Sequence, residues 1–169
     1  GKLFNDNEFS DVEIECDGEI LNCHQAILST RSDVFRAMFQ ADMAENRTKK
    51  VTIKDMDLDV AREMLQFIYT GDTNENVLKE KSKELLAAAE RYQLDVLKSI
   101  CEDHLCSNLQ VNNAVENLVF GDFHHASKLR RMSMKVIARN LGKIVKTEEY
   151  QNLVKHRSSL AAEIPMALV

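Results

Sequence analysis

The sequence predicts an α+β fold, with a small three-stranded sheet flanked by helices and followed by a segment made of helices only. Three observations lead to this prediction. Two separate stretches alternate apolar and polar residues as strands do, and one of them is followed by a turn and a returning stretch. Over most of the remaining chain, apolar residues recur at helical spacing. With 169 residues, of which 44% are hydrophobic, the chain can bury a substantial core.

The first elements expected are the two strands of a β-hairpin. Apolar and acidic residues alternate from Val12 to Cys16 in the stretch VEIEC, which is the pattern of a strand with one buried face. Asp17-Gly18 supplies a two-residue turn whose twist suits a hairpin. Residues 19–24 then return as the partner strand.

Two short helices and a third strand are expected next. The stretch QAILST, from Gln25, predicts a short apolar helix, and Ser32 can cap a second helix in which Phe35, Met38 and Phe39 share one face. After a polar stretch, residues 51–53 alternate again and predict the third strand.

The rest of the chain has helical periodicity. Asp57 begins a helix that ends at Gly71, a left-handed cap, and a loop is expected from Gly71 to Asn76. A helix capped by Ser82 follows, and the next helix covers residues 94–105. After Cys106 the apolar stripes predict helices over residues 112–122, 127–141, 147–156 and 158–168.

Charge divides the chain into two parts. Residues 1–105 hold 13 basic and 22 acidic side chains, whereas residues 106–169 hold 9 basic and 5 acidic ones. The sign of the net charge therefore changes near residue 105, and we expect two structural units, 1–105 and 106–169.

Within the second unit, the basic run Lys128 to Lys135 could meet phosphate. Because apolar residues recur through it at helical spacing, we interpret its charges as a solvated helix face and expect no nucleic-acid partner; these apolar residues are Leu129, Met132, Val136 and Ile137.

Cysteine usage indicates a reduced intracellular protein, cytoplasmic or nuclear. Cys16, Cys23, Cys101 and Cys106 are too few and too scattered for a disulfide framework. They also lack the paired short spacings of a structural zinc site, so we expect buried thiols, with no metal and no cofactor.

No apolar run reaches the ~18 residues that a membrane-spanning helix needs, and no membrane partner is expected.

The sequence offers no catalytic residues. Its five glycines stand alone, so a glycine-rich phosphate loop is lacking. His124-His125 would point about 100° apart on a helix, and we interpret the pair as the start of a helix. Asp55, Asp57 and Asp59 lack the glycine and terminal glutamate of a calcium loop. These absences favour binding over catalysis.

Five motifs over the first hundred residues resemble the BTB/POZ domain in order and spacing. They are FSDV (9–12), CHQAIL (23–28), SDVFRAMF (32–39), FIYTG (67–71) and LLAAAERYQLDVLKSICE (85–102). The stretch from Cys106 to Leu141 resembles the helical extension of MATH-BTB proteins, which consists of a 3-box and a shortened BACK domain. This resemblance implies a non-catalytic adaptor that joins a cullin-3 RING ubiquitin ligase to a substrate, which a MATH domain outside this chain would hold.

The resemblance also implies where cullin-3 would bind. The polar stretch from Gln40 to Lys50 contains one large apolar residue, Met43, and the family's recruiting loop contains a hydrophobic residue, any residue, then glutamate. Met43, Ala44 and Glu45, with Asp42 before them, occupy that loop. A flexible thioether can fill a groove on a helical partner. Because one small loop rarely makes a stable interface, a second contact is expected at Ser107, Asn108 and Leu109, although these residues could equally serve only to cap and pack the next helix.

Two self-association surfaces are implied as well. Members of the family pair two-fold through the first helices and the N-terminal segment, and Leu3, Phe4 and Ile27 match interface positions. The C-terminal helices offer a second surface that extends dimers into higher oligomers. Here Arg139 stands where an aromatic residue is expected.

Other functions remain open. BTB domains that recruit transcriptional corepressors tend to have a basic residue after the histidine of the CH motif, near the equivalent of Asp11, but this chain has Gln25 there. A purely oligomerising BTB module lacks the 3-box-like tail. An enzyme of unrecognised type is the remaining alternative.

Overall fold

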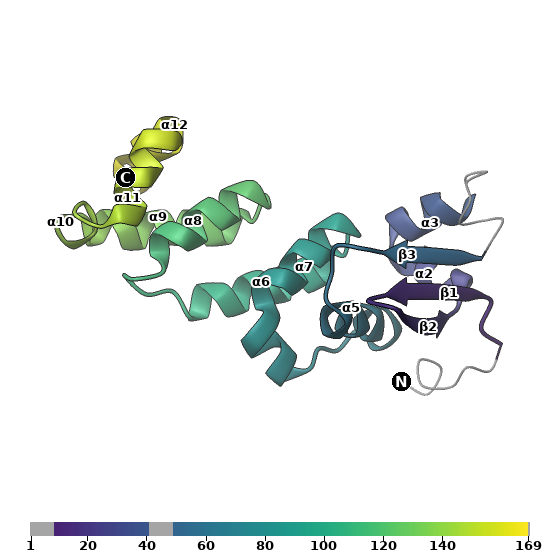
Figure 1. The fold of residues 1–169 in the computed structure, drawn as a ribbon. Helices are drawn as coiled ribbons and strands as arrows, with labels where there is room; N and C mark the ends of the chain where they lie inside the picture. Colours follow the sequence, from purple (N-terminus) through teal and green to yellow (C-terminus); the bar gives the residue numbers. More distant parts are fainter. Residues whose placement is uncertain (1–8, 41–48, 169) are drawn as a thin grey trace. The chain divides into compact units, whose positions relative to one another are not determined.

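The computed structural model describes residues 9–40 and 49–168 (Figure 1). The chain divides into two compact units, Gly1–Cys101 and Glu102–Val169. Within the described residues, the strands all lie in the first unit, and the second contains helices only. The boundary that the charge pattern predicts, between residues 105 and 106, falls inside α7 (Asp95–Ser107) and stays a prediction.

The first unit contains a three-stranded sheet in the order β2-β1-β3 (Figure 1). The central strand β1 (Val12–Cys16) pairs antiparallel with β2 (Glu19–Cys23) and parallel with β3 (Lys50–Ile53). Asp17 and Gly18 join β1 to β2 with φ angles of 50° and 79°. Both values are positive, as a type I′ turn requires. The predicted hairpin and third strand are therefore confirmed.

Two helices connect β2 to the polar stretch before β3. They are α2 (Gln25–Arg31) and α3 (Asp33–Gln40). The predicted cap is confirmed, because the Ser32 hydroxyl accepts a hydrogen bond from the Phe35 amide at 3.2 Å. The same hydroxyl donates to the carbonyl of Tyr92 at 2.7 Å, and the Phe35 ring stacks on the Tyr92 ring with centroids 4.8 Å apart. One side chain thus caps α3 and joins it to the end of a helix sixty residues later.

The helix after the sheet agrees with its apolar pattern. This helix, α5 (Leu58–Thr70), buries the predicted face of Val60, Met64, Leu65 and Ile68. It ends at Gly71, whose φ of 78° is left-handed and whose amide donates to the Phe67 carbonyl at 2.7 Å. A side chain is strained at this φ, so glycine is the residue that ends the helix at the lowest cost.

The next helix begins earlier than predicted. This helix, α6 (Glu75–Arg91), begins after Asn74, whose side chain accepts a hydrogen bond from the Asn76 amide at 2.9 Å. The Asn74 amide donates to the buried carboxylate of Glu63 at 2.5 Å, which fixes this start. Ser82 instead follows a kink at Lys81, where φ is −127° and ψ is 24°. The predicted start at Ser82 was wrong, because a contact with α5 sets the first turn.

The second unit contains the end of α7 from Glu102, helices α8 to α12 and the short 3₁₀ segment η1. Their bounds are α8 (Ala114–Phe123), α9 (Ser127–Arg139), α10 (Leu141–Ile144), α11 (Glu148–His156), α12 (Ser158–Glu163) and η1 (Ile164–Leu168). All four predicted helical stretches are present, and α10 is an addition. Their shared core is made of Ala114, Val115, Leu118, Met134, Ile137, Ile144, Leu153, Leu160, Ala161 and Ile164.

The basic run in α9 is mostly outside this core. Lys128 and Arg131 are exposed, as the solvated-face interpretation predicts, whereas Leu129 and Ile137 are buried. Met132 and Val136, expected on the apolar face, are only half-buried.

His124 and His125 do not start a helix. His124 follows the last residue of α8, and its amide donates to the Phe120 carbonyl at 3.0 Å. His125 has a φ of 52° and turns the chain toward α9. The prediction that the two histidines start a helix was wrong, because the left-handed His125 follows the end of α8 and α9 begins only at Ser127.

Candidate protein-interaction surfaces

The expected cullin-binding loop lies between two anchored elements. Asp42, Met43, Ala44 and Glu45 themselves lie outside the described residues. On one side, α3 is anchored by its buried residues Phe35 and Phe39. On the other, the Lys49 carbonyl accepts a hydrogen bond from the Glu13 amide in β1 at 2.9 Å. Both described flanks of the loop are therefore bound to the core of the first unit.

The second expected contact lies at the end of α7. The Ser107 hydroxyl donates to the Asp103 carbonyl at 2.9 Å, and the Asn108 side-chain amide donates to the His104 carbonyl at 2.9 Å. Ser107 and Asn108 are nevertheless exposed, and Leu109 is half-buried. The side chains of Ser107 and Asn108 thus bond to carbonyls of the last turn of α7 and are also exposed to solvent. The cullin contact stays a prediction.

The turn that follows α7 is built by one asparagine. The Asn113 side chain accepts a hydrogen bond from the Gln110 amide at 2.8 Å and donates to the Asn108 carbonyl at 3.1 Å. These two bonds link Asn113 to residues 108 and 110 ahead of α8.

Two of the three expected dimer residues, Leu3 and Phe4, lie outside the described part of the chain. Ile27 lies in the first turn of α2 and is half-buried. Phe9, a residue that the sequence did not single out for self-association, has a φ of 64° and an 82% exposed side chain. A single exposed apolar residue is common on a protein surface, so the exposure of Phe9 assigns it no role.

Asp11 is already engaged in hydrogen bonds with the start of α2. Its carboxylate accepts from the Gln25 backbone amide at 2.8 Å, and its carbonyl accepts from the Gln25 side-chain amide at 3.1 Å. Residue 25, where the resemblance implies a basic residue in corepressor-recruiting BTB domains, is therefore a neutral side chain bonded to the backbone of Asp11.

The thiols are free, and three of them are buried: Cys16, Cys23 and Cys101. Burial raises the pKa of the Cys23 thiol to about 12, and burial likewise raises the pKa of Cys101 to about 12. A thiol with such a pKa is protonated at neutral pH and is a poor nucleophile. The prediction of buried thiols is confirmed for these three residues, whereas Cys106 is half-buried.

Within residues 9–40 and 49–168, no group of three His, Cys, Asp or Glu side chains is placed to hold a metal ion. A search of the same residues found no helix with the length and hydropathy needed to cross a bilayer.

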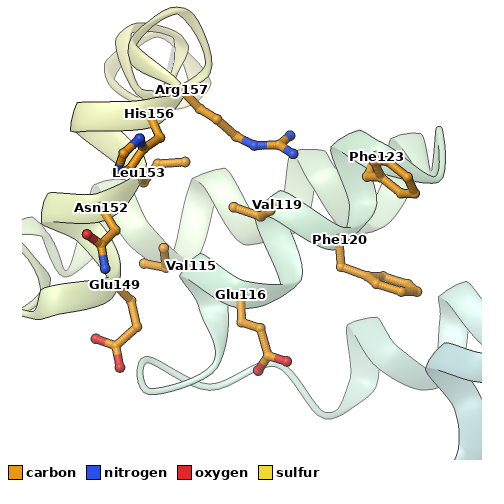
Figure 2. Close-up of a pocket in the computed structure, with 10 residues that line it drawn as sticks. All are labelled: Val115, Glu116, Val119, Phe120, Phe123, Glu149, Asn152, Leu153, His156 and Arg157. Carbon is orange, nitrogen blue, oxygen red and sulfur yellow. The ribbon is translucent and has the colours of Figure 1, made fainter.

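A groove that the sequence did not predict lies in the second unit, between α8 and α11 (Figure 2). It encloses about 560 Å³. Its apolar walls are Val115, Val119, Phe120, Phe123 and Leu153, and its polar rim is Glu116, Glu149, Asn152, His156 and Arg157. One signal was available in the sequence, since apolar residues in the α8 stretch AVENLVFGDF cover more of the helix than one buried face needs.

An ion network lies beside this groove. The Arg130 guanidinium is 2.9 Å from the Asp122 carboxylate and 2.6 Å from that of Glu163. The Arg157 guanidinium is 3.4 Å from Asp122. The hydrogen bond to Glu163 and the bond to Asp122 raise the pKa of Arg130 against the effect of its burial. Residues of α8, α9 and α12 are thereby linked at one point.

Comparison with known proteins identifies curated relatives over nearly the whole chain. TD and POZ domain-containing proteins 2 and 3 of Mus musculus are each 37% identical over 163 residues, which is 96% of this chain and 45% of each relative. The chain thus spans less than half the length of these relatives. The names of these relatives contain TD and POZ, and the MATH domain expected outside this chain stays a prediction.

Solved BTB structures also resemble the chain. The BTB domain of zebrafish PATZ1 is 23% identical, with a TM-score of 0.49, and the match covers 61% of this chain and 80% of that one. The BTB domain of human gigaxonin is 26% identical, with a TM-score of 0.46, and the match covers 55% and 75%. The family profile of the BTB/POZ domain matches residues 1–109. This match covers well over half of the sequence, and the chain therefore belongs to the BTB/POZ domain family.

Proposed function

We propose that this chain is the cullin-binding and self-associating part of a cullin-3 ubiquitin-ligase adaptor. BTB/POZ domains are protein-interaction modules and typically self-associate as dimers. In the proposed adaptor, Met43 and Glu45 contact the cullin-3 N-terminal region, with Asp42 and Ala44 in the same loop. A segment outside this chain binds the substrate, and the chain itself performs no catalytic step.

One observation supports the proposal above the others. The sequence Met43-Ala44-Glu45 occurs in a chain of the BTB/POZ family, between a helix and a strand whose ends are both bound to the core. Because the described flanks of this loop are already held, they lose little conformational entropy when the loop binds a partner. More of the contact energy of Met43 and Glu45 then contributes to affinity. The exposed residues Ser107 and Asn108 would add contact area.

The test is a calorimetric titration of this chain with the cullin-3 N-terminal region. In the double variant Met43→Ala/Glu45→Ala, we expect affinity to fall at least about a hundredfold, as the loss of two central contacts does in other interfaces. The matched control Asn46→Ala/Thr48→Ala changes the same loop outside the motif and should bind as the wild type does. Equal binding by the wild type and the double variant would exclude the loop.

The same titration separates the alternatives. If the wild-type chain does not bind the cullin-3 region and sedimentation still shows a dimer, the chain is a purely oligomerising module or recruits a corepressor. A second titration with a corepressor peptide then decides between these two. The bonds between Asp11 and Gln25 lead us to expect no corepressor binding.

A further inference from the structure

Helix α9, which Figure 1 shows in the second unit, contains five basic residues and no acidic one. The side that packs on the core carries its buried residues, which are Leu129, Ser133, Met134 and Ile137. On the opposite side, Arg131, Lys135 and Arg139 follow one another at intervals of four residues, which aligns them along the helix. Arg131 and Arg139 are exposed, and Lys135 is half-buried. We call these three residues the α9 basic face.

The charges of the α9 basic face are not neutralised by neighbouring carboxylates. Lys128, at the start of the same helix, is paired with Asp103. Within the part of the chain that the structure describes, no ion pair joins Arg131, Lys135 or Arg139 to a carboxylate. Like charges four residues apart on a helix repel each other and lower its stability. An anionic partner would relieve this repulsion, so its charge complements the face.

A row of apolar residues runs beside the cations. Met132 and Val136 are half-buried and lie four residues apart. Met132 is three residues before Lys135 and Val136 is three residues before Arg139, and residues three apart are neighbours on a helix surface. The two rows therefore form adjacent ridges, between which the side chains of a second helix can pack. Because the backbone groups of α9 bond within the helix, an extended peptide finds no strand edge here.

The α9 basic face suits an acidic protein segment better than a nucleic acid or a second copy of the chain. A two-fold contact through this face would place the same cations on both sides of the interface, where they repel. Helix α9 has no aromatic side chain on which a base could stack and no amide side chain that could read a base edge. The chain as a whole carries a net charge of −5, which opposes the approach of a long polyanion.

We propose that the α9 basic face binds an acidic amphipathic helix of another protein. Carboxylates four residues apart on that helix are spaced ~6 Å along its axis, as the three cations are. Its apolar side chains cover Met132 and Val136. This site is separate from the proposed cullin contacts, and the inference does not depend on them.

The experiment titrates the 169-residue chain into a labelled synthetic helix and follows fluorescence anisotropy. The peptide has about 16 residues and a length of ~24 Å, with glutamates four residues apart along one ridge and leucines along the next. We expect binding that added sodium chloride weakens, because salt screens exposed charges. A control peptide with glutamine in place of each glutamate should bind at least about tenfold more weakly. Failure of the acidic peptide to bind, or equal binding of the two peptides, would overturn the proposal.

Matched variants of the chain locate the bound peptide. Lys135→Glu reverses the charge at the centre of the face and should weaken the acidic peptide at least about tenfold. This variant should fold, since a glutamate there has Arg131 and Arg139 four residues away on either side. Lys155→Glu makes the same change at an exposed lysine of α11 and should alter affinity by less than about twofold. Circular dichroism checks both folds, and equal affinity of the wild type and the folded Lys135→Glu variant would refute the assignment.

Two further measurements test the class of the partner. At a salt concentration of about 0.15 M, a DNA duplex of about 20 base pairs should bind more weakly than the acidic peptide. Tighter binding of the duplex would exclude a protein partner of the proposed kind. Sedimentation of the chain alone should give the same mass for the wild type and for Lys135→Glu. A lower mass for the variant would show that a second copy covers the face, which also excludes the proposed partner.

Discussion

Single polar side chains join parts of the first unit that are distant in the sequence. Ser32 caps α3 and also bonds to Tyr92, and the buried carboxylate of Glu63 in α5 bonds to the backbone at the start of α6. A buried polar group that loses its partner destabilises the fold by about 1–3 kcal/mol. Residues of this kind therefore specify where helices begin as well as how they pack.

The buried thiols give a prediction at the level of single residues. Burial raises the pKa of Cys23 and of Cys101 from 9.0 to about 12, which lowers their thiolate fraction roughly a thousandfold at neutral pH. At pH 7.5 we expect Ellman's reagent to react with at most one thiol of the folded chain, that of the half-buried Cys106, and with all four in guanidinium. The variant Cys106→Ser should remove the signal of the folded chain. Rapid reaction of three or four thiols before unfolding would contradict the burial.

The same pKa shifts predict how stability depends on pH. A thiol whose pKa is raised in the fold keeps its proton where the unfolded thiol has lost it. The stability that this protonation provides is present below pH 9 and is lost as the pH rises from 9.0 to about 12. The urea midpoint should therefore fall above pH 9.

At the level of elements, α8 and the start of α9 approach closely at Gly121. A Cβ atom added to Gly121 would lie 3.0 Å from the Arg130 amide nitrogen and 3.3 Å from the Ala126 carbonyl oxygen. Both atoms belong to the backbone, so α8 and the start of α9 would have to shift apart by a few tenths of an ångström. The absence of a side chain at Gly121 thus sets how closely the two helices approach.

Alanine substitutions at two glycines test this close approach. Gly121→Ala should lower the free energy of unfolding by about 1–3 kcal/mol, as overpacking does. Gly142→Ala is the matched control, because a Cβ there meets nothing within 4 Å, and it should raise stability by up to ~1 kcal/mol through helix propensity. Urea unfolding followed by circular dichroism measures both. If the two substitutions change stability equally, the helices do not approach as closely as described.

At the scale of the whole molecule, membership of the BTB/POZ family leads us to expect self-association, because BTB domains typically form dimers. Ile27 lies on α2, and we predicted it at the two-fold interface. A two-fold axis presents each residue twice, so one substitution alters the interface at two places.

A charge at this position tests the interface. Ile27→Asp should raise the dimer dissociation constant at least about a hundredfold, because an unpaired buried charge is destabilising by several kcal/mol. Ile20→Asp, at a 48% exposed isoleucine of β2, is the control and should leave the dimer intact. Analytical ultracentrifugation gives the mass of each. An unchanged dimer for Ile27→Asp would place the axis elsewhere.

Local sequence patterns determined most of the fold. The alternation from Val12 to Cys16, the Asp17-Gly18 turn, the Ser32 cap and the left-handed Gly71 each depend on residues close in the chain. Periods and caps act over a few residues, so the sequence displays them directly. The motifs of the BTB/POZ family could be recognised for the same reason, and with them the expected interaction surfaces.

Only the tertiary structure decided the remaining features. The start of α6 depends on the bond between Glu63 and Asn74, and the α8/α11 groove depends on which faces of two helices stay uncovered after the second unit packs. His124 and His125 likewise end α8 because His125 adopts a left-handed φ. These outcomes depend on contacts between residues far apart in the chain or on a single backbone angle. A periodic sequence pattern shows the spacing of neighbouring residues. It shows neither long-range contacts nor a single backbone angle.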